Sequence, residues 1–257
     1  MKMKFRHKSE TFVEIDSAKI YYEELGNSQK QPLIFLHGGF GNIEDFNGMI
    51  PLLKKEYRII GIDSRGQGKS TLGVNELSYA QLEIDVKTII AKLNLENPII
   101  IGFSDGGIVG LRLASVNEIN IDKLIVIGTT WHSKSLEKSK DILGGITANS
   151  WKEKFPNTFE IYQRINPTPD FDVLTKAIVP MWIDETATGH PNDKVENITC
   201  PTLIVRGDKD FLVGKRHTFE LSEKIKDSNL ANIPFCGHEV YVEQPELLMS
   251  IVNQFLS

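Results

Sequence analysis

Residues 98–110 read Pro-Ile-Ile-Ile-Gly-Phe-Ser-Asp-Gly-Gly-Ile-Val-Gly, an apolar run that breaks at a serine and then resumes with helical spacing. A chain that turns sharply from a strand into a helix needs glycine on both sides of the turn, because a side chain there would clash with the flanking backbone. Gly102 and Gly106 meet that need, and the turn pushes the hydroxyl of Ser104 outward. We interpret Ser104 as a candidate nucleophile, with an ordinary glycine-rich turn as the alternative.

The composition is that of a globular protein. The 257 residues are 40% hydrophobic and 25% charged, which suits one domain with an inserted subdomain. A net charge of −5 argues against nucleic-acid binding. The basic start at residues 1–8 lacks the apolar stretch of a signal peptide, and no apolar run is long enough to cross a membrane. Two cysteines, Cys200 and Cys236, make neither a disulfide framework nor a metal cluster, so a reduced, cytoplasmic setting is expected.

Apolar strands alternate with helical segments along most of the chain, which predicts an α/β fold. The expected strands are 11–16, 19–25, 32–36, 57–62, 98–103, 124–127, 202–205 and 230–233, and the expected helices are 45–53, 78–93 and 105–116. The first two strands form a hairpin, and the last three are apolar enough to be buried on both faces. We therefore predict a mostly parallel eight-stranded sheet with helices on both faces.

This alternation fails between residues 129 and 199, a segment rich in charged residues and prolines that holds all three tryptophans. We predict a helical cap at 129–199, inserted into a core formed by 1–128 and 200–257. A cap in that place would lie over the carboxyl ends of the strands, where open α/β sheets bind ligands. Its aromatic residues could simply attach the cap to the core, but together they favour a pocket roof, with Trp131 and Trp182 as substrate contacts.

A serine nucleophile needs a general base, which is itself oriented by an acid. Of the six histidines, His238 follows the last expected strand in a Gly-His loop. The others lie in a ragged amino terminus, in a glycine-rich loop, in the cap or at a helix start: His7, His37, His132, His190 and His217. Asp208 and Asp210 both follow the strand at 202–205. We favour Asp210 as the acid and give Asp208 a turn-forming role, so the chain order is Ser104, Asp210, His238.

The reaction also needs donors for a developing oxyanion. The amide of Asp105 follows the nucleophile at a helix start, and the amide of Gly39 lies in the glycine-rich loop after the third strand. Phe40 would then project toward the substrate. Residues 63–70 lack the spacing of a phosphate-binding loop, so we interpret them as a structural turn.

Taken together, these motifs resemble the α/β-hydrolase superfamily over nearly the whole chain outside the cap. They are His37-Gly38-Gly39, Asp63-x-Arg65-Gly66-x-Gly68-x-Ser70, Gly102-Phe103-Ser104-Asp105-Gly106-Gly107, Gly207-x-x-Asp210 and Gly237-His238. The Ser-Asp-Gly-Gly form is similar to valacyclovir-hydrolase-like and lactonase-like branches, where the acidic residue can face the pocket. The loop at 37–41 is similar to that of proline iminopeptidases, but Phe40 stands where they carry proline.

The resemblance implies a carboxylesterase-like serine hydrolase that cleaves a small ester, thioester, lactone or activated amide through an acyl-serine intermediate. It implies no cofactor and no metal, and a small molecule as the partner. Asp105 could attract a substrate amine or could simply suit the helix dipole. Perhydrolase, lyase or carbon–carbon hydrolase chemistry on the same fold, and a non-catalytic receptor for a small ligand, stay open as alternatives.

Overall fold

The computed structural model describes residues 3–53 and 57–257, with the backbone alone at 136–138; the first two residues of the basic start lie outside the described residues. Eight strands form one sheet in the order β1-β2-β4-β3-β5-β6-β7-β8. The strands are β1 Phe12–Ile15, β2 Ala18–Gly26, β3 Pro32–Leu36, β4 Arg58–Ile62, β5 Ile99–Phe103, β6 Lys123–Ile127, β7 Thr202–Gly207 and β8 Ser228–Ile233. β1 and β2 pair antiparallel, β2 pairs antiparallel with β4, and the remaining pairs are parallel. The predicted mostly parallel sheet is confirmed.

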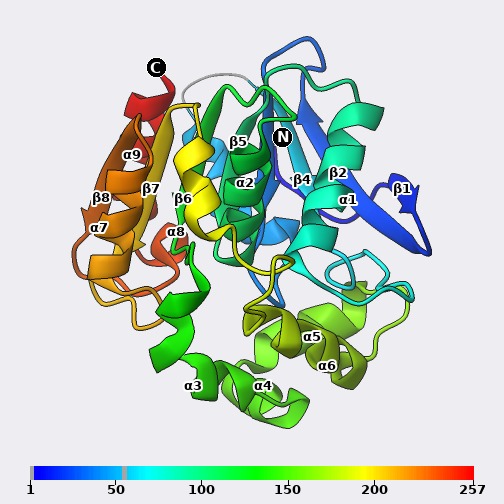
Figure 1. The fold of residues 1–257 in the computed structure, drawn as a ribbon. Helices are drawn as coiled ribbons and strands as arrows, with labels where there is room; N and C mark the ends of the chain where they lie inside the picture. Colours follow the sequence, from blue (N-terminus) through cyan, green and yellow to red (C-terminus); the bar gives the residue numbers. More distant parts are fainter. Residues whose placement is uncertain (1–2, 54–56) are drawn as a thin grey trace.

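Helices cover both faces of the sheet (Figure 1). The α-helices are α1 Tyr79–Lys92, α2 Asp105–Val116, α3 Lys140–Gly144, α4 Ala148–Lys154, α5 Pro156–Ile165, α6 Phe171–Trp182, α7 Lys215–Lys224, α8 Val240–Glu243 and α9 Pro245–Leu256. The 3-10 segments are η1 Ile43–Gly48, η2 Ile50–Leu52, η3 Ser133–Lys138 and η4 Asn192–Asn197.

The central strands are apolar throughout because alternate side chains enter two different cores. On β5, Ile100 packs with the core beneath α1 and α2, whereas Ile99 and Ile101 pack with the core beneath α8 and α9. Burial on both faces keeps these strands in one register, so the loops at their carboxyl ends have fixed positions.

The chain between β6 and β7 is helical. In Figure 1, α3 to α6 lie together beyond one end of the sheet. Aromatic side chains from α4 and α6 pack on Phe40, which follows β3, so this end is the carboxyl end of the strands. η4, which closes the segment, packs against α2 of the core. No helix among the described residues is long and apolar enough to cross a membrane.

Two predicted elements differ from the structure. The helix expected at 45–53 is replaced by η1 and η2, because Pro51 lacks a backbone donor and Gly48 favours a break. β8 lies at the sheet edge, and Leu230 is 40% exposed, so this strand is not buried on both faces as predicted. An apolar sequence does not reveal whether a strand has a neighbour on each side.

Candidate active site

Ser104 occupies the turn between β5 and α2. Its backbone has φ +49° and ψ −115°, a conformation that side-chain-bearing residues rarely adopt. A methyl group at Gly106 would lie 2.0 Å from the carbonyl oxygen of Leu36, and one at Gly102 would lie 2.3 Å from the carbonyl oxygen of Gly106. The two glycines are therefore required by the close approach of other backbone, and the strained serine, which is half-buried, lies at the carboxyl end of the sheet.

Asp210 and His238 form a hydrogen-bonded pair. Nδ1 of His238 lies 2.8 Å from Oδ2 of Asp210, and Oδ1 of Asp210 accepts the backbone N–H groups of Leu212 at 2.9 Å and Val213 at 3.0 Å. Burial opposes ionisation of Asp210, but its hydrogen bonds and the nearby imidazole outweigh burial and lower its pKa below the ordinary value. An ionised acceptor at Nδ1 leaves Nε2 of His238 free to act as a base.

Asp208, the competing acid, lies in the same loop and contacts the loop after β8. Its Oδ1 accepts the backbone N–H of Cys236 at 3.3 Å, which ties the loop after β7 to the loop after β8. This contact gives Asp208 the turn-forming position that the sequence suggested, and the structure places Asp210 against the imidazole.

The imidazole of His238 lies beside the serine turn. Its ring centroid is 4.9 Å from that of Phe103, the residue before Ser104. On the other side, a methyl group at Gly128 would lie 3.1 Å from Nδ1 of His238. The loops after β5, β7 and β8 thus bring Ser104, Asp210 and His238 to one end of the sheet.

The glycine-rich loop after β3 packs against the serine turn. A methyl group at Gly38 would lie 3.2 Å from Cβ of Ser104. His37 is fully buried, with Nε2 accepting the N–H of Ser64 at 2.9 Å and Nδ1 donating to the carbonyl of Gly38 at 2.7 Å. Burial lowers the pKa of His37, so the ring stays neutral and serves as a support for this loop.

The carboxyl group of Asp105 points into the protein. Oδ1 accepts the hydroxyl of Tyr79 at 2.8 Å, and Oδ2 accepts Nε1–H of Trp182 at 2.8 Å. Burial raises the pKa of Asp105 above its ordinary value. Both oxygens hold protein donors, which argues against the idea that this carboxylate attracts a substrate amine.

Phe40 lies inside an aromatic cluster with Trp151, Phe171 and Trp182. Its ring centroid is 4.5 Å from Trp151, 5.0 Å from Phe171 and 5.3 Å from Trp182. Phe40 is only 3% exposed, and its backbone has φ +58°. Phe40 and Trp182, expected as substrate contacts, thus pack the helical segment between β6 and β7 against the loop that carries Gly39.

Trp131 packs on the core rather than with this aromatic cluster. Its ring stacks on His217 of α7 at a centroid distance of 5.0 Å, and its Nε1–H donates 2.8 Å to the backbone carbonyl of His217. Trp131 was expected to contact substrate; these contacts place it against α7.

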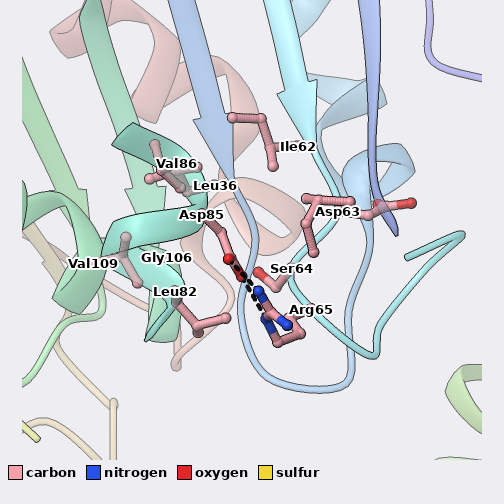
Figure 2. Close-up of a pocket in the computed structure, with 11 residues that line it drawn as sticks. Leu36, Ile62, Asp63, Ser64, Arg65, Leu82, Asp85, Val86, Gly106 and Val109 are labelled. Carbon is pink, nitrogen blue, oxygen red and sulfur yellow. Dashed lines mark hydrogen bonds and ion pairs between the residues drawn. The ribbon is translucent and has the colours of Figure 1, made fainter. Parts of the chain in front are cut away.

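Residues 63–70 form the expected turn. Figure 2 shows a cavity beside it, lined in part by Arg65, Asp85 and Val109. Arg65 is fully buried and its Nε and Nη2 reach the two oxygens of Asp85 at 2.8 and 2.5 Å. Ser104 and His238 do not line this cavity, so we assign it to the packing of the core.

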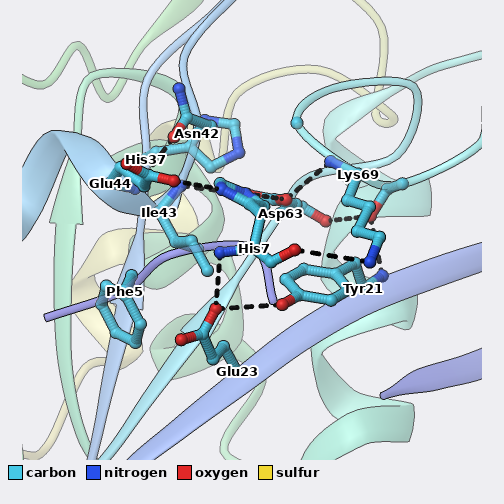
Figure 3. A network of polar contacts seen from close by, with 12 residues as sticks. Phe5, His7, Tyr21, Glu23, His37, Asn42, Ile43, Glu44, Asp63 and Lys69 are labelled. Atoms are coloured by element: carbon cyan, nitrogen blue, oxygen red, sulfur yellow. Dashed lines mark hydrogen bonds and ion pairs between the residues drawn. The ribbon is translucent and has the colours of Figure 1, made fainter. Parts of the chain in front are cut away.

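His7 is the main polar residue that the sequence did not predict. Instead of lying in a ragged terminus, its side chain is buried, with Nε2 2.7 Å from Asp63 and Nδ1 2.8 Å from Glu44 (Figure 3). Burial opposes protonation, but the two carboxylates outweigh it and raise the pKa of His7 to about 9. Both partners are distant in sequence, so no local pattern signals this network.

Among the described residues, no group of three or more His, Cys, Asp or Glu side chains is placed to hold a metal ion. Cys200 and Cys236 are buried free thiols.

The sequence matches a family described as alpha/beta hydrolase fold over residues 31–162. The chain belongs to this family. The AB hydrolase superfamily protein YisY of Bacillus subtilis is 28% identical, with 92% of this chain and 94% of that protein aligned. The serine hydrolase BPHL of Mus musculus is 26% identical, with 95% of this chain and 85% of that protein aligned.

A solved carboxylesterase structure from Nitrososphaera gargenis superposes with a TM-score of 0.77 and 21% identity, covering 96% of this chain and 97% of that one. At this level of identity the likeness shows the fold. The α/β-hydrolase fold predicted from the motifs is therefore confirmed.

Proposed function

We propose that this protein is a serine hydrolase that cleaves a small carboxylic ester, thioester, lactone or activated amide through an acyl-serine intermediate. The observation that carries the proposal is the Asp210–His238 pair at 2.8 Å beside the strained turn of Ser104. A base oriented by a buried acid, close to a serine hydroxyl, is the arrangement that activates serine. The relationship to a protein named as a serine hydrolase supports the same chemistry.

In the proposed reaction, Nε2 of His238 takes the proton of Ser104 as Oγ attacks the substrate carbonyl carbon. The carbonyl oxygen becomes an oxyanion that accepts hydrogen bonds from the amides of Gly39 and Asp105. When the carbon–leaving-group bond breaks, His238 protonates the departing group. Water, deprotonated by the same imidazole, then attacks the acyl-serine, and the acid product leaves with Ser104 restored. Asp210 holds the imidazole in the required tautomer throughout.

The substrate is proposed to be a small molecule, since nothing in the composition suggests nucleic acid or a membrane as partner. We also propose a cytoplasmic setting, on the ground that Cys200 and Cys236 are both free thiols. No cofactor is included in the proposed chemistry.

The test is hydrolysis of p-nitrophenyl acetate and butyrate, together with fluorophosphonate labelling, by the wild type and by Ser104→Ala. We expect the variant to lose labelling and to lose activity by a factor on the order of 10⁶. Ser115→Ala is the matched control, because Ser115 lies on α2 and its hydroxyl donates only to the carbonyl of Leu111. Labelling of the wild type without turnover would support a small-ligand receptor, and no labelling at all would refute the proposed nucleophile.

A further inference from the structure

The carboxylate of Asp105 joins three separate parts of the fold. It belongs to the first residue of α2, and its two oxygens accept hydrogen bonds from Tyr79 at the start of α1 and from Trp182 at the end of α6. The side chain is 5% exposed. Burying a carboxylate costs free energy unless the carboxylate accepts hydrogen bonds, so these two donors offset the cost of burying Asp105.

This carboxylate also lies against the glycine-rich loop. A methyl group at Gly39 would lie 2.8 Å from Oδ2 of Asp105 and 2.5 Å from Cζ2 of Trp182. The backbone amides of Gly39 and Asp105 are the two oxyanion donors in the proposed function. The Asp105 side chain therefore fills the space beside one donor while its own backbone supplies the other.

We propose that Asp105 is a positioning residue. Its carboxylate sets the spacing of the two oxyanion donors and makes that spacing depend on how the cap packs against the core. This inference rests on the proposed function. Through Trp182, the cap holds Oδ2 against Gly39; through Tyr79, the core holds Oδ1. Because an oxyanion hole acts by donors fixed before the reaction, loosening either contact reduces stabilisation of the tetrahedral intermediate more than it reduces binding of the substrate.

Trp151 supplies a matched control for Trp182. Both indoles contact Phe40, at centroid distances of 4.5 Å for Trp151 and 5.3 Å for Trp182. The Nε1–H of Trp182 donates to Asp105, whereas Nε1 of Trp151 is buried with no hydrogen-bond partner among the described residues. Trp→Phe at the two positions thus removes similar aromatic surface, but only one substitution removes a hydrogen bond to the carboxylate.

The experiment measures kcat and KM for p-nitrophenyl acetate with Trp182→Phe, Tyr79→Phe and Trp151→Phe, with the Tm of each variant to verify folding. We expect Trp182→Phe and Tyr79→Phe to lower kcat by about tenfold or more, because the loss of a hydrogen bond to a charged group costs enough free energy for a rate change of about that size. KM should change less than about threefold. Trp151→Phe should keep kcat within about twofold. Equal effects of the two Trp→Phe variants would overturn the proposal.

The double variant Asp105→Asn/Trp182→Phe completes the test. If the carboxylate and the indole act as one unit, the double variant is no slower than the slower single variant. Additive losses would contradict the coupling. A KM increase in Asp105→Asn confined to aminoacyl esters, with neutral esters unaffected, would instead make the carboxylate an amine-binding group. An inactive, unlabelled wild type would refute the proposed function, whereas an active wild type with an unaffected Trp182→Phe would refute only the positioning role.

Discussion

Nδ1 of His238 and Oδ2 of Asp210 are 2.8 Å apart, although the two residues are 28 positions apart in the sequence. The contact forms because β7 and β8 are parallel neighbours, so the loops that follow them leave the sheet at the same end. The remaining oxygen of Asp210 is held by two backbone N–H groups, which fixes the direction from which the acid meets the ring.

Asp210→Asn should lower kcat for p-nitrophenyl acetate by about 10⁴-fold, because an amide at this position favours the wrong imidazole tautomer. Asp208→Asn is the control. It removes the same charge from the same loop but keeps an oxygen that can accept the N–H of Cys236. We expect it to retain activity within a fewfold. If Asp208→Asn were the more damaging change in steady-state assays, the assignment of the acid would be reversed.

The sequence predicted the pieces of this site because each has a local signal. Apolar runs marked the strands, and glycines marked the turns at 102–106 and 237, so the order Ser104, Asp210, His238 could be inferred without coordinates. The choice of Asp210 over Asp208 as the partner of the imidazole rested on the expected path of one turn after Gly207. In the structure, Asp210 makes the contact with the ring.

Side-chain partners across the fold could not be predicted in the same way. Trp131 and Trp182 looked alike in the cap sequence, yet one binds the backbone of His217 and the other binds Asp105. Likewise, His7 is buried by Asp63 and Glu44, which lie 56 and 37 residues away. Such contacts depend on packing between distant segments, for which a single sequence carries no periodic pattern.

Gly39→Ala should lower kcat by up to about 10²- to 10³-fold, the value of one oxyanion donor, because the added methyl would collide with Trp182 and Asp105. Gly48→Ala is the matched control, since a methyl there meets no atom within 4 Å. Steady-state kinetics on p-nitrophenyl acetate gives the comparison. Full activity in Gly39→Ala would count against the Gly39 amide as an oxyanion donor.

His7 should make folding stability depend on pH in the alkaline range. Its pKa is about 9 in the folded protein against an ordinary value of 6.5, so the folded state binds the proton more tightly. The stabilisation is fully present below pH 6.5 and is lost as the pH rises through about 9. Urea unfolding of the wild type and His7→Gln from pH 6 to pH 10 should show a steeper loss in the wild type. Parallel slopes would contradict a protonated His7 in the folded state.

The pKa of Asp45 is shifted in the opposite direction from that of Asp210. It closes the capping box of η1, with Oδ2 accepting the N–H of Asn42 at 3.0 Å. Burial, with a further contribution from nearby acidic groups, raises its pKa from 3.8 to about 7. The folded state therefore favours the protonated carboxyl, and the wild type loses stability as the pH rises from about 4 to about 7.

Asp45→Asn removes this ionisation and keeps an oxygen that can accept the N–H of Asn42. We expect the variant to have a higher Tm than the wild type at pH 8, with a difference that shrinks as the pH falls toward 4. Asp45→Ala is the control, because it also lacks the charge but loses the hydrogen bond from the N–H of Asn42, which costs roughly 1 kcal/mol at every pH. A Tm difference between Asp45→Asn and the wild type that stays constant from pH 4 to pH 8 would mean that Asp45 ionises normally in the folded protein.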